Sequence, residues 1–266
     1  MNTKYKIIAI CNFLSVILII SVTYIGDNGF NGNTVRGVSA KYYHLFTPSP
    51  YAFAIWGLIF LGLLIYTISQ LVTAFKKNGD VEIIKRTGWW FNAANIFNFL
   101  WLFAWLTENI FLSLVIMIGI LTSLLMVVIK TRLGLEKISI SKKMVVYWPI
   151  GIYIGWISVA LIANTAAFLV KIGWEPLLFD NKSWTIVMMM VAIILNLFLL
   201  IKRNMVTFNL VGVWALYAIY VRHMESQEIL ATTAIIGVSI ISIGIFLFAV
   251  RNFYSYFKTS STRNIS

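Results

Sequence analysis

Eight long apolar runs dominate the 266-residue chain, and every charged residue falls between two runs or at the chain ends. The runs cover approximately residues 7–25, 51–75, 89–106, 110–129, 146–170, 184–201, 205–221 and 229–250. A helix rises about 1.5 Å per residue, so roughly 20 apolar residues span the hydrocarbon core of a bilayer. Continuous runs of this length indicate helices rather than the alternating strands of a membrane barrel. The pattern therefore predicts an all-α, polytopic helical membrane protein with eight spans.

The basic residues predict how these spans are oriented. If the number of spans is even, 16 of the 21 Lys and Arg residues lie on the side of the two chain ends. The remaining five are Arg36, Lys41, Lys171, Lys182 and Arg222. Loops on the cytoplasmic side of a membrane carry an excess of Lys and Arg. We therefore expect a multi-pass protein of a bacterial inner (cytoplasmic) membrane with both termini cytoplasmic. Its basic residues would contact anionic lipid headgroups rather than nucleic acid.

The residue types missing from the runs exclude several functions. No Asp, Glu, Lys, Arg or His falls inside a run, whereas ion-coupled carriers place an ionisable group near the membrane centre. His44, His223 and the single cysteine, Cys11, form no metal-ligand pattern. No paired carboxylates or activated nucleophile are spaced for catalysis. We expect no metal site and no catalytic residues, and a binding protein rather than an enzyme.

Aromatic and asparagine residues recur at helical spacing within three of the runs. The sets are Phe53, Trp56 and Phe60; Asn98, Trp101 and Trp105; and Tyr153, Trp156, Ala160 and Asn164. Such spacing brings each set to one face of its helix. Trp156 lies near mid-membrane, where an interfacial belt does not explain it, and asparagine amides can accept from buried indole N–H groups. Two interpretations remain open, namely packing between helices and a ligand pocket.

The first loop, residues 26–50, is the longest stretch between two runs. Its first half is rich in Gly and Asn, which predicts flexibility, and its second half contains Phe46, Pro48 and Pro50 before Tyr51. Proline stiffens the chain and is tolerated where a helix begins. The loop is either a plain connector or a lid over the end of the helix bundle.

The loop and the aromatic stripes resemble the TspO/MBR family of tryptophan-rich sensory proteins and mitochondrial translocator (peripheral benzodiazepine receptor) proteins. Pro48 lies eight residues before Trp56, as the second family proline lies before its Trp. The matching segments are Ile55-Trp56-Gly57-Leu58-Ile59-Phe60, Asn98-Phe99-Leu100-Trp101, and Tyr153-Ile154-Gly155-Trp156 followed by Asn164. The resemblance covers about residues 1–175.

Some positions depart from the family pattern. The paired prolines of the family loop are split here into Pro48 and Pro50, and Phe46 and Tyr51 replace the tryptophans beside them. Ala166-Ala167-Phe168 stands where animal members carry the Tyr and basic residue of a proposed sterol motif. The resemblance therefore favours a porphyrin over a sterol as the ligand.

The resemblance implies a five-helix bundle over residues 1–175. The last three apolar runs have no counterpart in the family core and predict a three-helix transmembrane extension with a short cytoplasmic tail over residues 176–266. The bundle would bind an apolar planar ligand, a porphyrin or similar tetrapyrrole such as protoporphyrin or haem, in a tryptophan-rich intramembrane pocket. The expected ligand-binding residues are Tyr51, Phe53, Trp56, Phe60, Asn98, Trp101, Trp105, Tyr153, Trp156, Ala160 and Asn164, and the expected lid residues are Phe46, Pro48 and Pro50.

The role of such a pocket would be sensing the ligand or its passage across the membrane. An uncoupled small-molecule transporter and an enzyme of light-dependent porphyrin breakdown are the alternatives. Expected partners are membrane lipid, the small apolar ligand and, as the resemblance implies, a second copy of the chain in a homodimer.

Overall fold

The computed structural model describes residues 3–136, 138–174 and 180–263. This part of the chain consists of helices, turns and loops and contains no β-strand. Eight long helices each coincide with one apolar run, which confirms the all-α prediction. They are α1 (Thr3–Asn28), α3 (Ile55–Phe75), α5 (Trp90–Leu106), α6 (Ile110–Lys130), α8 (Trp148–Lys171), α9 (Asn181–Arg203), α10 (Val206–His223) and α11 (Glu228–Arg263).

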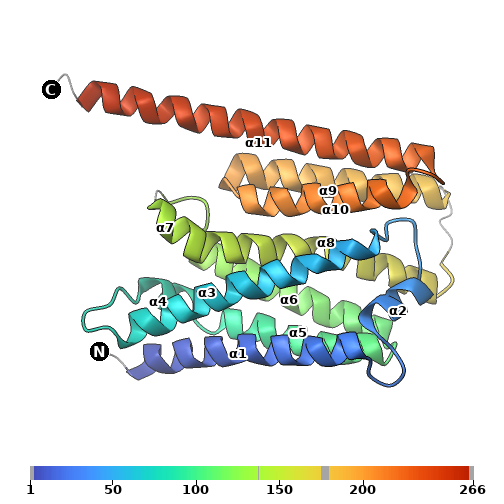
Figure 1. Ribbon diagram of the computed structural model, residues 1–266, viewed down its shortest axis with the longest axis horizontal. Helices are drawn as coiled ribbons and strands as arrows, with labels where there is room; N and C mark the ends of the chain where they lie inside the picture. Colours follow the sequence, from blue (N-terminus) through green and yellow to red (C-terminus); the bar gives the residue numbers. More distant parts are fainter. Residues whose placement is uncertain (1–2, 137, 175–179, 264–266) are drawn as a thin grey trace.

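Six of the long helices in the described residues have the length and apolar composition needed to cross a membrane. They are α1, α3 with the turn before it, α6, α8 with the turn before it, α9 and α11. Helices α5 and α10 are not among the six, although both lie alongside the others in the bundle (Figure 1). The chain is therefore a multi-pass membrane protein, and the count of eight spans stays a prediction.

Short helical elements lie between the long ones. They are α2 (Val35–Lys41), η1 (Pro50–Ala54), α4 (Glu82–Thr87), α7 (Ile140–Lys142) and the π-helical turn η2 (Lys143–Tyr147). Helix α2 forms in the Gly/Asn-rich loop that the sequence predicts to be flexible. Thr34 caps this helix by accepting from the Gly37 N–H at 3.0 Å, and the Trp105 indole donates to the Val35 carbonyl at 3.1 Å. The first loop is thus partly helical and anchored on α5.

The long helices are arranged in layers (Figure 1). Helices α1, α3, α5, α6 and α8 form one bundle, α9 and α10 lie beyond α8, and α11 covers α9 and α10. The predicted boundary between residues 175 and 176 falls within residues 175–179, which lie outside the described residues. The division into a five-helix unit and an extension stays a prediction.

Helices α8 and α10 approach each other closely because α8 presents two glycines. A Cβ atom on Gly151 would lie 2.1 Å from the Thr207 Oγ1 atom, and one on Gly155 would lie 3.0 Å from the Val211 Cβ atom. Small residues four positions apart let helix backbones pack closely within a membrane. The C-terminal helices therefore dock on the bundle through the glycine-bearing face of α8.

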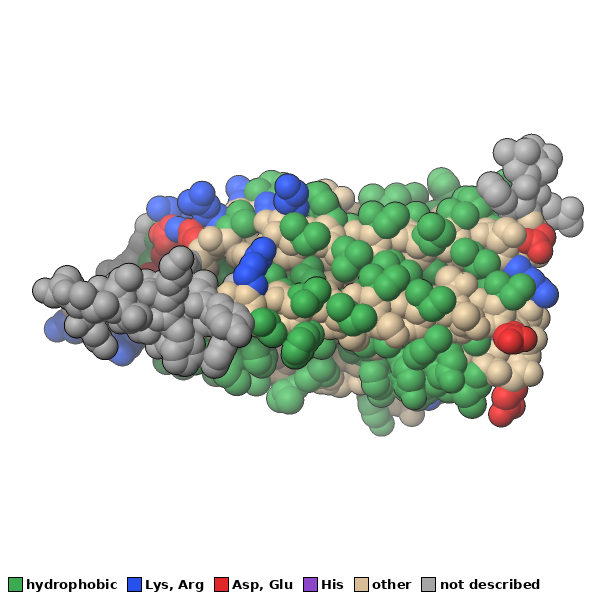
Figure 2. Space-filling view, turned by 90° about the horizontal axis from the view of Figure 1, so that it is seen from above, with side chains coloured by type: hydrophobic (Ala, Val, Ile, Leu, Met, Phe, Trp, Pro, Cys, Tyr) green, Lys and Arg blue, Asp and Glu red, His purple; other side chains and the backbone are tan. Residues whose placement is uncertain are grey.

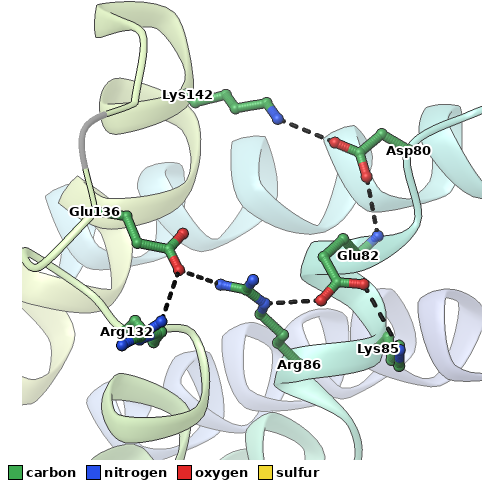
Figure 3. A network of polar contacts seen from close by, with 7 residues as sticks. All are labelled: Asp80, Glu82, Lys85, Arg86, Arg132, Glu136 and Lys142. Carbon is green, nitrogen blue, oxygen red and sulfur yellow. Dashed lines mark hydrogen bonds and ion pairs between the residues drawn. The ribbon is translucent and has the colours of Figure 1, made fainter.

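Helix α1 begins and helix α11 ends at the same end of the bundle, which we call the terminal end (Figure 1). Lys and Arg side chains gather toward this end, whereas hydrophobic side chains cover the length of the molecule (Figure 2). Ion pairs here join the loops around α4 and α7 (Figure 3). Arg86 contacts Glu82 at 2.9 Å and Glu136 at 2.8 Å, and Lys142 contacts Asp80 at 3.0 Å. These bonds hold the terminal end of the bundle together.

Candidate functional site

A cavity lies near the end of the bundle opposite the terminal end, among α2, α3, α5, α6 and α8. Its empty space is about 710 Å³, including the part that is open to the exterior. Eight of the eleven predicted ligand-binding residues line it, namely Phe53, Trp56, Asn98, Trp101, Trp105, Trp156, Ala160 and Asn164. Whether they bind a ligand stays a prediction.

The aromatic rings of the cavity wall pack against one another. Trp101 and Trp105 stack with ring centroids 5.6 Å apart and planes at 20°. Phe53 meets Trp156 edge to face with centroids 6.0 Å apart. Both arrangements are favourable for aromatic pairs beyond the area that they bury. The result is a wall of flat apolar rings contributed by separate helices.

Asparagine amides hold these rings in place. The Trp101 indole donates to the Asn164 Oδ1 atom at 2.9 Å, as the spacing predicted, and Asn164 donates to the Ser113 hydroxyl at 3.0 Å. Asn98 donates to the Tyr153 hydroxyl at 2.9 Å. Hydrogen bonds between buried groups are strengthened by the low local dielectric. They fix α5, α6 and α8 relative to one another around the cavity.

Two predicted site residues stand behind the wall rather than in it. Phe60 stacks on Trp56 with ring centroids 5.3 Å apart. Tyr153 is fully buried, and its ring lies 6.3 Å from Trp56 while its hydroxyl accepts from Asn98. Neither lines the cavity. Both support side chains that do.

The predicted lid residues have different positions. Pro48 lines the cavity, whereas Pro50 is exposed and begins η1. Phe46 is buried against residues of α8, α9 and α10. Tyr51 does not line the cavity and instead packs edge to face on Trp214 of α10, with centroids 5.2 Å apart. The predicted lid therefore faces α10 as well as the cavity.

We call residues 43–54 the lid segment, and α10 holds it through its backbone. Three hydrogen bonds join the two, from Ser49 N to Ala218 O (3.0 Å), from Trp214 Nε1 to Ala52 O (3.1 Å) and from His223 Nε2 to Leu45 O (2.7 Å). The partners are more than 160 residues apart in the sequence, so no local pattern could reveal them. The C-terminal helices thus fix one wall of the cavity.

Four further polar residues of the cavity wall were not predicted from the sequence, namely Ser39, Tyr42, His44 and Thr47. Their only signal was their position in the unusually long first loop. The Thr47 N–H donates to the His44 carbonyl at 2.9 Å, which forms a tight turn. Burial lowers the pKa of His44 to about 4, although a backbone contact with Ala163 opposes the shift. The imidazole is therefore neutral at pH 7.

Glu108, in the turn between α5 and α6, anchors α2 beside the cavity. Its carboxylate contacts the Lys41 ammonium at 2.7 Å, and it accepts from the Tyr42 hydroxyl at 2.8 Å and the Asn33 amide at 3.2 Å. The hydrogen bonds from Lys41 and Tyr42 lower the pKa of Glu108 to about 2. The carboxylate is therefore ionised at any physiological pH.

A second cavity lies beside the first, and its empty space is about 520 Å³, including the part that is open to the exterior. Five residues line both, namely Val35, Phe53, Trp56, Asn98 and Trp101. The remaining lining residues of the second cavity are Val22, Thr23, Arg36 and Leu102. The same aromatic rings thus form walls of both spaces.

The family model described as TSPO-like protein matches residues 8–247 of the chain. The match extends past residue 175, where the motif resemblance ends, and includes α9, α10 and most of α11. Comparison with curated proteins and with solved structures gives no match. Because the family model covers most of its length, the chain belongs to the TSPO-like protein family.

Proposed function

We propose that this membrane protein binds an apolar planar ligand of the tetrapyrrole kind in the tryptophan-lined cavity. The observation that carries the proposal is the wall of aromatic rings from α3, α5 and α8, held by the hydrogen bonds of Asn98 and Asn164. Flat apolar rings offer a large stacking surface to a planar ligand. A preorganised wall also lowers the entropy cost of binding.

Sensing of the bound ligand is favoured over its passage across the membrane. On the side of the cavity toward the terminal end, the bundle is filled by Ile59, Leu63, Tyr66 and Phe91, all fully buried. A ligand that passed through the bundle would have to displace this packed core, and packed cores resist such movement. Uncoupled transport is therefore the second candidate.

The proposal includes a location in a bacterial cytoplasmic membrane with both termini cytoplasmic. The basic side chains at the terminal end support this orientation. The cavity would then lie near the outer face of the membrane, beneath the lid segment.

A comparison of Trp156→Phe with Trp174→Phe tests ligand binding. Trp156 lines the cavity and is 3% exposed, whereas Trp174 follows α8, is 40% exposed and lines neither cavity. We expect Trp156→Phe to weaken protoporphyrin binding about two- to tenfold, since an aromatic contact contributes about 0.5–1.5 kcal/mol beyond area burial. The titration should follow the absorption of protoporphyrin, because each variant removes an indole from the protein emission.

Trp174→Phe is the matched control and should leave the affinity unchanged. Both variants should keep the yield and the thermal transition of the original chain. Equal losses at the two positions, or no saturable binding by the original chain, would contradict the proposal.

A further inference from the structure

The second cavity differs from the first because a cationic side chain, that of an arginine, is part of its wall. Arg36, on α2, lines the second cavity and is exposed, and no other Lys or Arg lines either cavity among the described residues. The residues beside it in the wall include Val22 and Leu102, which are apolar. Arg36 therefore lies at the edge of an otherwise largely apolar space.

Two other cations at this end of the bundle already have partners. Lys41 pairs with Glu108 at 2.7 Å, and Lys171 lies 5.8 Å from the centre of the Tyr42 ring. Arg36, by contrast, has no hydrogen-bond or ion-pair partner within the described part of the chain. An arginine without a partner retains its full capacity to bind an anion, since its planar guanidinium presents five donors.

We infer that Arg36 and the second cavity form a subsite for an anionic group, so that the ligand is a planar amphiphile carrying a carboxylate. The apolar body would lie against the rings of Trp56 and Trp101, which line both cavities. The carboxylate would extend past them into the second cavity and accept from the guanidinium in a bidentate manner. This inference rests on the proposed function and specifies the chemistry of its ligand.

Titration with protoporphyrin and with its dimethyl ester tests the subsite, because the two compounds share a ring system and differ in charge. The protein should be held in uncharged detergent, in its original form and as Arg36→Gln. We expect the original chain to bind the diacid about two- to fivefold more tightly than the ester, as is typical of a partly exposed ion pair. Arg36→Gln should remove this difference by weakening the diacid alone. Added salt should reduce the difference in the original chain.

Lys182→Gln is the matched control, since Lys182 is an exposed cation in the first turn of α9 and lines neither cavity. It should leave the preference for the diacid intact. Equal weakening of both compounds by Arg36→Gln would indicate a structural role for Arg36 and overturn the inference. An unchanged diacid affinity in Arg36→Gln would overturn it as well.

Three further outcomes separate lipid from ligand as the source of the anion and the subsite from the proposed function. The diacid could be preferred through Arg36 in bilayers that contain phosphatidylglycerol but not in uncharged detergent. This result would assign Arg36 to lipid headgroups and overturn the inference. Equal, saturable binding of both compounds by the original chain would overturn the subsite and leave the proposed function standing. Saturable binding of neither compound would overturn both.

Discussion

His44 is a titratable side chain on the cavity wall whose surroundings favour the neutral form. Its Nδ1 atom is enclosed and has no hydrogen-bond partner among the described residues. An imidazolium carries two N–H donors, so protonation would leave a buried donor unpaired, which is costly. Burial accordingly lowers the pKa of His44 from 6.5 to about 4. The lid segment is thus built around a neutral histidine.

This environment predicts that acid weakens ligand binding. Because the pKa is lower in the folded state, the stability that neutral His44 contributes is full above pH 6.5 and is lost as the pH falls toward 4. We expect the affinity for protoporphyrin to be lower at about pH 5 than at about pH 7.5, as the lid segment loosens. The glutamine of the His44→Gln variant does not titrate, so the affinity of this variant for protoporphyrin should change less between about pH 5 and about pH 7.5. The same acid-induced loss in both proteins would show that a group other than His44 is responsible.

At the residue scale, the sequence predicted the helix faces and missed the loop. Asn98, Trp101 and Trp105 line the cavity together because helical geometry alone brings them to one face. Tyr51 and Phe46 were expected to line or cover the cavity, but they turn toward α10 and the helices beside it. The direction of a loop side chain depends on distant contacts, which spacing along one segment does not encode.

At the scale of elements, the hydrogen bonds between α10 and the lid segment make a C-terminal helix part of the site. Trp214→Phe would remove the indole donation to the Ala52 carbonyl while keeping an aromatic ring against Tyr51. We expect faster hydrogen exchange of the lid segment and weaker ligand binding by up to about tenfold, since one such bond contributes about 0.5–1.5 kcal/mol. Exchange measured by mass spectrometry on peptides covering residues 43–54 would report the change.

Trp89→Phe is the control for this effect. Trp89 is 52% exposed and precedes α5 at the terminal end, and it lines neither cavity. Its replacement should leave exchange of the lid segment unaltered. A lid segment that exchanges equally in both variants would mean that α10 does not restrain it.

Apolar runs located all eight long helices but none of the short elements. The run at 205–221 became Val206–His223, for example, because about 18 apolar residues can bury their backbone polar groups only in a helix. Helix α2 has seven residues, too few to be stable alone, and depends on the Thr34 cap and on Trp105. Its position could not be read from hydropathy, since its stability comes from a residue about 70 positions away.

At the scale of the whole molecule, the C-terminal helices support the lid segment beside the cavity of the bundle. The sequence separated residues 1–175 as the functional unit because the recognised motifs end there. In the structure, the lid segment hydrogen-bonds to Trp214, Ala218 and His223, and α8 contacts α10 through Gly151 and Gly155. A chain without α10 would keep Asn98 and Asn164 but lose these supports of the lid. The family match extends through residue 247 and so includes α10.

The even number of long helices and the distribution of charge predict the topology of the whole chain. Helix α1 begins and helix α11 ends at one end of the bundle (Figure 1), and the sequence predicts 16 of the 21 Lys and Arg residues on that side. A fluorescent protein that folds only in the cytoplasm should therefore fluoresce when fused after Asn78 or at the C-terminus. A phosphatase that is active only outside should be active when fused after Gly32, in the loop that leads to α2.

The C-terminal fusion decides between eight spans and a smaller, odd number. Helix α5 has 17 residues and would extend about 26 Å, somewhat less than a hydrocarbon core of about 30 Å. If α5 or α10 alone failed to cross, the C-terminus would move to the outer side, while the fusion after Asn78 would remain inside. Phosphatase activity at the C-terminus would therefore contradict the eight-span topology. Fluorescence there would support it, because α5 is packed between α1 and α6 and buries Asn92, Asn95 and Asn98 within the bundle.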